Sequence, residues 1–182
     1  MTLIIYQSNY GHTKQYADWI AEELNSQAIP FSAVDPSEIE SHATVIFGHS
    51  VYAGSYKKAA SIRKIMEAYP DKNYIFFGVN LADTNQAKER DYLLAKVQKA
   101  LGQDAYQKLK IFFFRGGIDY SKLSTIHRAM MWMLTRQLKS KAPEDRSESD
   151  QSLIEIYGGK LDLMDRQQIS PLLDYFNGLS QS

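Results

Sequence analysis

The feature that most constrains the fold is a regular alternation of short apolar runs with longer segments of helical periodicity. The apolar runs are rich in strand-forming residues and span 3–6, 29–34, 43–48, 73–79 and 109–114. The segments that repeat apolar residues at helical spacing span 13–25, 57–68, 87–101 and 167–179. Buried apolar strands that alternate with amphipathic helices indicate an α/β fold, with helices on both faces of a parallel sheet.

The same order of elements predicts the topology of the sheet. Because crossovers between parallel strands are almost always right-handed, the pattern predicts a doubly wound five-stranded parallel sheet of order 2-1-3-4-5. Ligands of such sheets bind beyond the carboxyl ends of the strands, here between strands 1 and 3. The sequence contains no internal repeat and no linker, so residues 1–182 are expected to form a single domain.

One segment, about residues 119–157, does not fit the alternation and is expected to be an insertion between strand 5 and the last helix. Its first part is apolar and rich in methionine around Trp132. Its second part, residues 140–150, is strongly polar and is expected to be mobile.

Composition excludes several classes of function. The chain has no cysteine, which removes disulfides, thiolate nucleophiles, iron–sulfur clusters and cysteine-ligated zinc, and no metal site is expected. Its 21 basic and 21 acidic residues balance, which argues against nucleic acid as a partner. Neither a signal peptide nor an apolar run of about 20 residues is present, so a cytoplasmic protein is expected.

The turn between the first strand and the first helix carries the strongest functional signal. Ser8, Gly11 and Thr13 fit a Ser/Thr-x-x-Gly-x-Thr pattern. A helix N-terminus offers free N–H groups and partial positive charge, and the two hydroxyls can donate further hydrogen bonds, so this turn suits a phosphate. The candidate phosphate-binding residues are Ser8, Asn9, Tyr10, Gly11, His12 and Thr13. The plainer alternative is a turn in which Ser and Thr only cap the helix.

Other phosphate motifs and one related fold are excluded. No Gly-Lys-Ser/Thr follows, so the turn is not a nucleoside-triphosphatase P-loop, and its spacing does not fit Gly-x-Gly-x-x-Gly. Receiver domains share the strand order but require an acidic cluster at the end of strand 1, where this chain has Tyr6, Gln7 and Ser8.

Residues 8–17 resemble the FMN-phosphate signature of flavodoxins, Ser/Thr-x-Thr-Gly-x-Thr with an alanine four residues on. The resemblance implies a flavodoxin-like fold with FMN as cofactor. Tyr10 stands where many flavodoxins carry Thr, so that hydroxyl is replaced while the backbone donors remain.

In flavodoxins, the loops after strands 3 and 4 hold the flavin ring. The resemblance therefore adds two groups of candidate cofactor residues: Ser50, Val51, Tyr52, Ala53 and Gly54, and Asn80, Leu81 and Ala82. Tyr52 or Tyr56 could stack on the ring, and Gly54 would free the backbone beside the flavin N5. The second loop has no aromatic residue, which would leave one ring face open to a substrate. A glycine-rich surface loop is the alternative.

Three further motifs resemble one branch of the superfamily, the menaquinone-dependent protoporphyrinogen IX dehydrogenases. They are Gly48-x-Ser50-Val51-x-x-Gly54, Val79-Asn80-Leu81-Ala82 and Gly117-Ile118-Asp119-Tyr120. The resemblance implies an enzyme of heme biosynthesis that oxidises a tetrapyrrole with FMN and passes electrons to a quinone. Two alternatives remain: a flavodoxin-type electron carrier, which is typically acidic, and a binding module without flavin. No catalytic side chain is expected, since FMN supplies the redox chemistry.

The insertion is basic as well as apolar. Its basic residues are Arg115, Lys122, Arg128, Arg136, Lys139, Lys141 and Arg146, against Asp119, Glu144 and Asp145. Such a segment is typical of helices that lie on an anionic membrane or bind an acidic, apolar molecule such as a porphyrin. The sequence thus predicts peripheral contact with the inner face of the cell membrane through residues 121–141. In the alternative, its apolar residues pack on the sheet.

Overall fold

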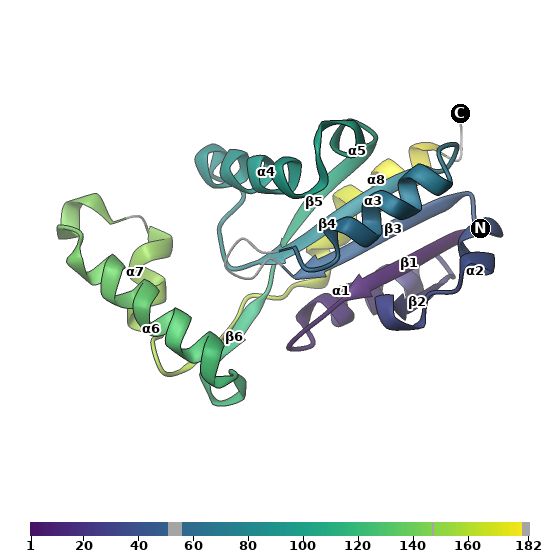
Figure 1. Ribbon diagram of the computed structural model, residues 1–182. Helices are drawn as coiled ribbons and strands as arrows, with labels where there is room; N and C mark the ends of the chain where they lie inside the picture. Colours follow the sequence, from purple (N-terminus) through teal and green to yellow (C-terminus); the bar gives the residue numbers. More distant parts are fainter. Residues whose placement is uncertain (51–55, 147, 180–182) are drawn as a thin grey trace.

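A computed structural model of the protein describes residues 1–50, 56–146 and 148–179. Its centre is a five-stranded parallel sheet whose order, β2-β1-β3-β4-β5, confirms the predicted topology (Figure 1). The strands are β1 (Thr2–Gln7), β2 (Gln27–Pro30), β3 (Thr44–Ser50), β4 (Asn73–Asn80) and β5 (Leu109–Arg115).

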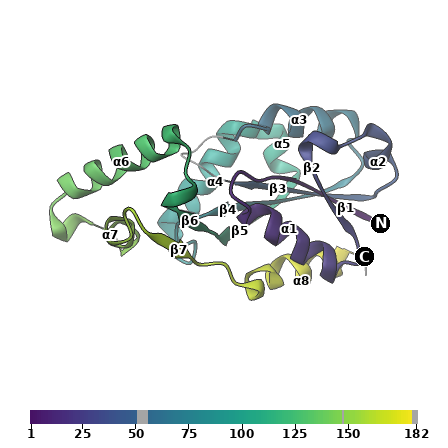
Figure 2. The ribbon, with the colours of Figure 1, turned by 90° about the horizontal axis from the view of Figure 1, so that it is seen from below.

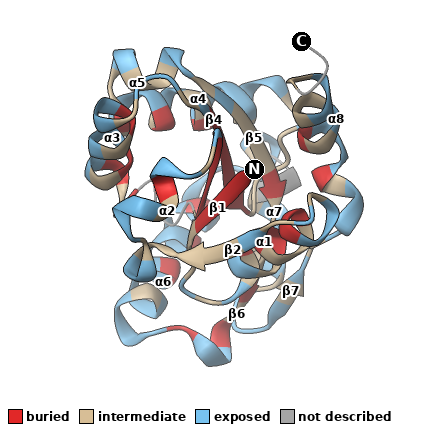
Figure 3. Cartoon of the chain, turned by 90° about the vertical axis from the view of Figure 1, so that its right-hand side faces the viewer, coloured by how far each residue is buried: buried red, intermediate tan, exposed pale blue. Residues whose placement is uncertain are grey.

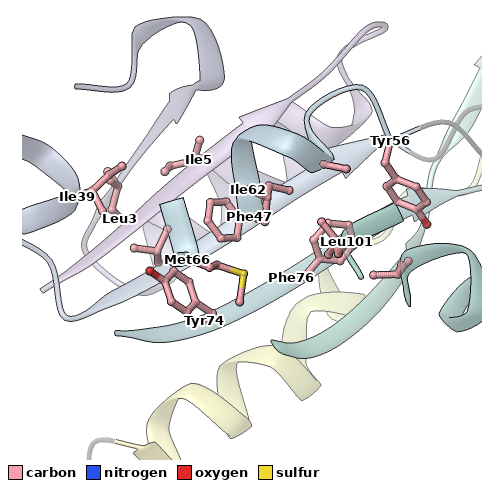
Figure 4. Packing of buried hydrophobic residues seen from close by; sticks show 13 residues of the cluster. Leu3, Ile5, Ile39, Phe47, Tyr56, Ile62, Met66, Tyr74, Phe76 and Leu101 are labelled. Atoms are coloured by element: carbon pink, nitrogen blue, oxygen red, sulfur yellow. The ribbon is translucent and has the colours of Figure 1, made fainter. Parts of the chain in front are cut away.

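Helices cover both faces of this sheet, as the pattern predicts (Figure 2). They are α1 (His12–Glu23) and α8 (Ser170–Leu179) on one face, and α3 (Ala59–Ala68) and α4 (Ala87–Leu101) on the other. Since successive side chains of a strand point to opposite faces, Leu3 and Ile5 of β1 join the core under α3 and α4, while Ile4 joins the other. Figure 4 shows the first core, and Figure 3 shows that burial concentrates in the sheet.

The register of the central strands brings their carboxyl ends to one edge. Gln7 at the end of β1 lies beside His49 of β3, and Ser50 at the end of β3 lies beside Val79 of β4. The loops that follow these strands therefore open at the same edge, where the sequence predicts the ligand site.

The second strand differs from its prediction. It spans Gln27–Pro30 instead of 29–34, and the residues after it form a 3-10 helix, Phe31–Ala33. Pro30 has no N–H to extend the ladder, so the strand ends there. Ile29 and Phe31 still pack against the first core, so the apolar run indicated burial correctly but not strand length.

Several smaller features complete the main unit. The pattern did not predict two short helices, α2 (Pro36–Glu40) and α5 (Gln103–Gln107). The closing helix begins later than expected, because a 3-10 helix, Arg166–Ile169, precedes it. Pro171 lies in the first turn of α8, as predicted.

The insertion forms a small unit of its own beyond the carboxyl ends of the strands (Figures 1 and 2). Its elements are β6 (Gly117–Asp119), a 3-10 helix (Tyr120–Lys122), α6 (Thr125–Ser140), a 3-10 helix (Pro143–Asp145), α7 (Glu148–Glu155) and β7 (Lys160–Asp162). Strands β6 and β7 pair antiparallel and join the unit to β5. Its core is a separate cluster of Ile118, Tyr120, Leu123 and Met131.

The polar run 140–150, for which the sequence predicts mobility, has regular secondary structure in part. It contains the 3-10 helix Pro143–Asp145 and the start of α7. Local polar contacts hold it: Lys141 pairs with Asp150 at 2.8 Å, and the Arg146 guanidinium donates to the carbonyls of Lys139 and Lys141, each at 2.9 Å.

Helix α6 does not pack on the five-stranded sheet, the alternative that the sequence left open. Its buried Met131 lies in the core of the insertion, and α6 lies against α7. Within the described residues, no helix combines the length and apolar character needed to cross a bilayer.

Candidate functional site

The turn from β1 into α1 presents an uncapped helix N-terminus. Gly11 stands at the N-cap with φ 96° and ψ −26°, and no side chain caps the helix there. The Gly11 N–H donates to the Ser8 hydroxyl at 3.1 Å. Because Ser8 accepts this bond, its own hydroxyl proton can still be donated to a ligand. The first-turn amides of α1 are likewise available to an anion.

The Thr13 hydroxyl is the clearest example in the site of a buried polar group without a hydrogen-bond partner among the described residues. The residue as a whole is only 1% exposed. Leaving such a group unpaired in the interior costs about 1–3 kcal/mol. Thr13 also lines a cavity, so its hydroxyl is placed to bind a ligand there.

The end of β4 supplies a second set of polar groups. The Asn80 side-chain oxygen accepts from the Ala82 N–H at 2.7 Å, which leaves the amide nitrogen without a partner in the described structure. The Ser50 hydroxyl at the end of β3 is likewise buried and unpaired among the described residues. These groups fit the polar edge of a ligand that lies across the strand ends.

Two glycines after β5 let three chain segments meet at this edge. A Cβ on Gly116 would lie 2.7 Å from Val79 Cγ1, and one on Gly117 would lie 2.6 Å from the Leu161 carbonyl oxygen. Either contact is too close for a side chain to fit. In the sequence, Gly117 stood out only as part of the motif Gly117-Ile118-Asp119-Tyr120, and the close packing at the two glycines was not predicted.

These loops form one wall of a cavity of about 430 Å³, a volume typical of small-molecule and cofactor sites. The predicted residues that line it are Ser8, Tyr10, His12, Thr13, Ser50, Asn80, Leu81 and Ala82. A second part of the lining, which the sequence did not predict, carries one acidic residue, Glu89 of α4, and is otherwise apolar: Tyr92 and Leu93 of α4, Met130, Met131 and Leu134 of α6, and Leu153 of α7. The Met-rich pattern of α6 was the only sequence signal for that wall.

The remaining predicted residues do not line this cavity. Asn9 is exposed, and Gly11 contributes backbone and faces a smaller pocket beside the β6–β7 hairpin. The flavin-loop residues Val51, Tyr52, Ala53 and Gly54 lie outside the described residues.

Tyr10 connects the turn to the insertion. Its hydroxyl hydrogen-bonds with His127 Nδ1 and accepts from the Ser124 N–H at 3.3 Å. The rings of Tyr10 and His127 meet edge to face, with centroids 5.6 Å apart. The Tyr10 side chain therefore fixes the start of α6 beside the phosphate-type turn, a role that the threonine common at this position in flavodoxins would be too short to fill.

Comparison with known families gives a match to the flavodoxin domain over residues 3–145. The chain belongs to the flavodoxin domain family. The match covers the five-stranded sheet, the candidate loops and α6, and ends before α7. Proteins of this family typically bind FMN. No curated protein matches the sequence.

Three solved structures resemble this flavodoxin domain at low identity. They are a flavodoxin of Streptococcus pneumoniae TIGR4 (17% identity, 59% of this chain and 90% of that chain, TM-score 0.35), a flavodoxin from the domain Archaea (20%, 59% and 96%, 0.37) and the Trp repressor binding protein of Bacillus subtilis (11%, 64% and 85%, 0.39). With TM-scores this low, the assignment rests on the family match and the observed strand order.

Two histidines near the site of this flavodoxin domain, His12 and His49, have pKa values lowered by burial and are neutral at neutral pH. Burial lowers the pKa of His12 below its usual 6.5, with Asp162 opposing the shift. Burial also lowers the pKa of His49, whose Nδ1 donates to the Ser50 carbonyl at 2.7 Å. Neither imidazole adds positive charge at the turn, where the amides and hydroxyls described above are placed to bind an anion. Lys122 and Lys160 line the smaller pocket beside it. Among the described residues, no group of His, Cys, Asp or Glu could hold a metal ion.

Proposed function

We propose that this protein is an FMN-dependent oxidoreductase of the flavodoxin type. Its substrate would be a tetrapyrrole of the protoporphyrinogen kind, and a quinone would accept the electrons. The observation that carries the proposal is the buried, unpaired hydroxyl of Thr13 at an uncapped helix N-terminus, in the wall of a cavity of about 430 Å³. A phosphorylated cofactor would satisfy each of these groups.

The residues present fit FMN in type and position. The amides of the first turn of α1, with the hydroxyls of Ser8 and Thr13, would hold the phosphate. Asn80 Nδ2 and the Ser50 hydroxyl, unpaired within the described chain, would serve the polar edge of the ring. Bound FMN supplies the electron-accepting ring, while the protein binds, orients and shields it.

The apolar wall supports a substrate site, which favours an enzyme over an electron carrier. Met130, Met131 and Leu134 of α6 line the same cavity as the cofactor loops and give it an apolar surface. A carrier needs no such apolar wall beside its cofactor, and its acidic docking charge is absent here, since the chain is electrically balanced. A largely apolar substrate suits this wall, in agreement with the motif resemblance to protoporphyrinogen dehydrogenases.

The cofactor proposal is tested by titrating the apoprotein with FMN and following flavin fluorescence. Thr13→Val keeps the shape of the side chain but removes its hydroxyl, so affinity should fall roughly tenfold to a hundredfold, as a hydrogen bond to a charged group predicts. Thr44→Val, at the amino end of β3, is the matched control and should bind FMN like the wild type. Equal affinity of the Thr13 and wild-type proteins would contradict the proposed phosphate site.

The substrate proposal needs a separate experiment. The FMN-loaded protein is mixed anaerobically with protoporphyrinogen IX while the flavin absorbance is recorded. Bleaching by the substrate, followed by recovery on addition of a quinone, is the expected result. If the protein binds FMN but protoporphyrinogen IX does not bleach it, the proposed substrate is wrong, while the FMN site stands.

A further inference from the structure

The insertion meets the main unit at the loops of the candidate cofactor site. Within the described residues, the core of the insertion packs against two apolar side chains of the main unit. One is Tyr10 of the turn between β1 and α1, and the other is Leu81 of the loop after β4. The chain itself joins the two units through the β6–β7 hairpin (Figures 1 and 2). A ligand that fixes these loops therefore acts on the contact with the insertion.

Tyr10 is bonded to the first turn of α6. Its hydroxyl hydrogen-bonds with His127 Nδ1 and accepts from the Ser124 N–H at 3.3 Å. Ser124 is the N-cap of α6, and its own hydroxyl accepts from the His127 N–H at 3.3 Å. One side chain from the phosphate-type turn thus contacts both the cap of the helix and the residue that the cap holds.

The residue that Tyr10 contacts lies on the face of α6 that lines the cavity. His127, Met131 and Leu134 are spaced four and three residues apart, so they lie along one face of the helix. Met131 and Leu134 line the cavity of about 430 Å³, together with Tyr10 itself. The contact between Tyr10 and His127 therefore sets where the apolar wall stands relative to the phosphate-type turn.

We propose that Tyr10 is a positioning residue that couples occupancy of this turn to the placement of α6. Its neighbours Ser8, Gly11 and Thr13 are among the residues that would hold the phosphate of FMN. A phosphate held there fixes the backbone that carries Tyr10, and a tyrosine side chain has only two torsions left to vary. Bound cofactor therefore favours the arrangement in which Tyr10 contacts His127 and α6 lines the cavity.

This coupling rests on the proposed function and deepens it, because it links the apolar wall of the substrate site to the presence of the cofactor. Coupling between two sites is reciprocal, so the contact between Tyr10 and His127 must also strengthen FMN binding. The alternative is an insertion held in place by its hairpin alone, in which Ile118 pairs with Leu161. FMN would then leave the local opening of α6 unchanged.

Hydrogen exchange of the α6 amides in the full-length protein, with and without saturating FMN, tests the coupling. Amides that exchange by local opening respond to a ligand only if the ligand favours the closed arrangement. FMN should therefore slow exchange at residues 127–134 by about twofold to tenfold, the range expected for one hydrogen bond of ordinary strength. Riboflavin, which lacks the phosphate, should slow it much less.

Tyr10→Phe keeps the ring and removes only the hydroxyl, so in this variant FMN should no longer slow exchange in α6. FMN affinity should fall by a similar factor, while riboflavin affinity should not change. The matched control is Tyr74→Phe, which removes a hydroxyl that donates to the Tyr69 carbonyl at 2.7 Å in the core under α3 and α4. This control should keep both the FMN affinity and the slowing of exchange in α6.

The inference is overturned if FMN binds but leaves exchange in α6 unchanged, a result that would leave the FMN site itself standing. Equal slowing in α6 and in β3 and β4 would also overturn it, because a ligand that only raises global stability acts on all of them. So would a Tyr10→Phe variant in which FMN still slows α6 as in the wild type. A protein that binds no FMN at all would remove the coupling and the proposed function together.

Discussion

At Gly11 the backbone requires a glycine for conformational rather than steric reasons. Its φ of 96° lies in the left-handed region, yet a Cβ there would meet nothing within 4 Å. Gly11→Ala should therefore cost about 1–2 kcal/mol through backbone strain alone. Urea unfolding measures this loss, and FMN affinity should fall with it because the turn shifts.

Gly178, in the last helix, is the matched control. It has open space around its Cα and a φ outside the positive range. Alanine is the better helix former, so Gly178→Ala should leave stability unchanged or raise it by up to about 1 kcal/mol. Equal losses at both positions would show that Gly11 has no special backbone role.

The burial of His49 predicts how the free energy of unfolding depends on pH. Burial lowers the pKa of His49 below 6.5, and the hydrogen bond to Ser50 opposes this only in part. Below pH 6.5 the unfolded chain takes up a proton that the folded protein excludes, so stability is full above that pH and falls as the pH drops towards the folded pKa. His49→Gln should therefore lose less unfolding free energy than the wild type between about pH 7 and pH 5. Parallel pH profiles would contradict this account of His49.

At the scale of elements, α6 packs against the rest of the protein through one face only. Its stability should therefore differ from that of the sheet. Met131 is 8% exposed within the insertion core, whereas Met133 on the same helix is 64% exposed. Met131→Ala should destabilise the insertion by about 2–3 kcal/mol, and Met133→Ala should change almost nothing. Hydrogen exchange of the α6 amides, with β3 and β4 as internal reference, measures both. Equal loss of protection in α6 and the central strands would show that the insertion and the sheet unfold together.

The elements also differ in how well the sequence predicts them. The central strands carry continuous apolar runs because both faces are buried, and this signal is local. Strand β7 is only Lys160–Asp162, with both of its end residues exposed, and it exists because it pairs with β6 about 40 residues earlier. Pairing of that kind leaves no periodicity in the sequence, so the hairpin was not predicted.

At the scale of the whole molecule, the site joins two units that the sequence describes unequally. Thr13 was predicted from the phosphate-type pattern that follows the first strand, and Asn80 from the resemblance to flavodoxins, in which the loop after strand 4 holds the flavin ring. The apolar wall from α4, α6 and α7 was not, since nothing in the sequence states where the insertion lies relative to the sheet. Tyr10 makes that connection through His127, 117 positions further along the chain.

The most direct test of the central claim compares FMN with riboflavin, which differs only in lacking the phosphate. If the turn at Ser8–Thr13 holds that phosphate with several amides and hydroxyls, FMN should bind at least about a hundredfold more tightly than riboflavin. Thr13→Val should reduce this difference in affinity, because it weakens the binding of FMN and leaves that of riboflavin unchanged. Isothermal titration of the apoprotein with both ligands measures it. Equal affinities for FMN and riboflavin, or no binding of either, would contradict the account.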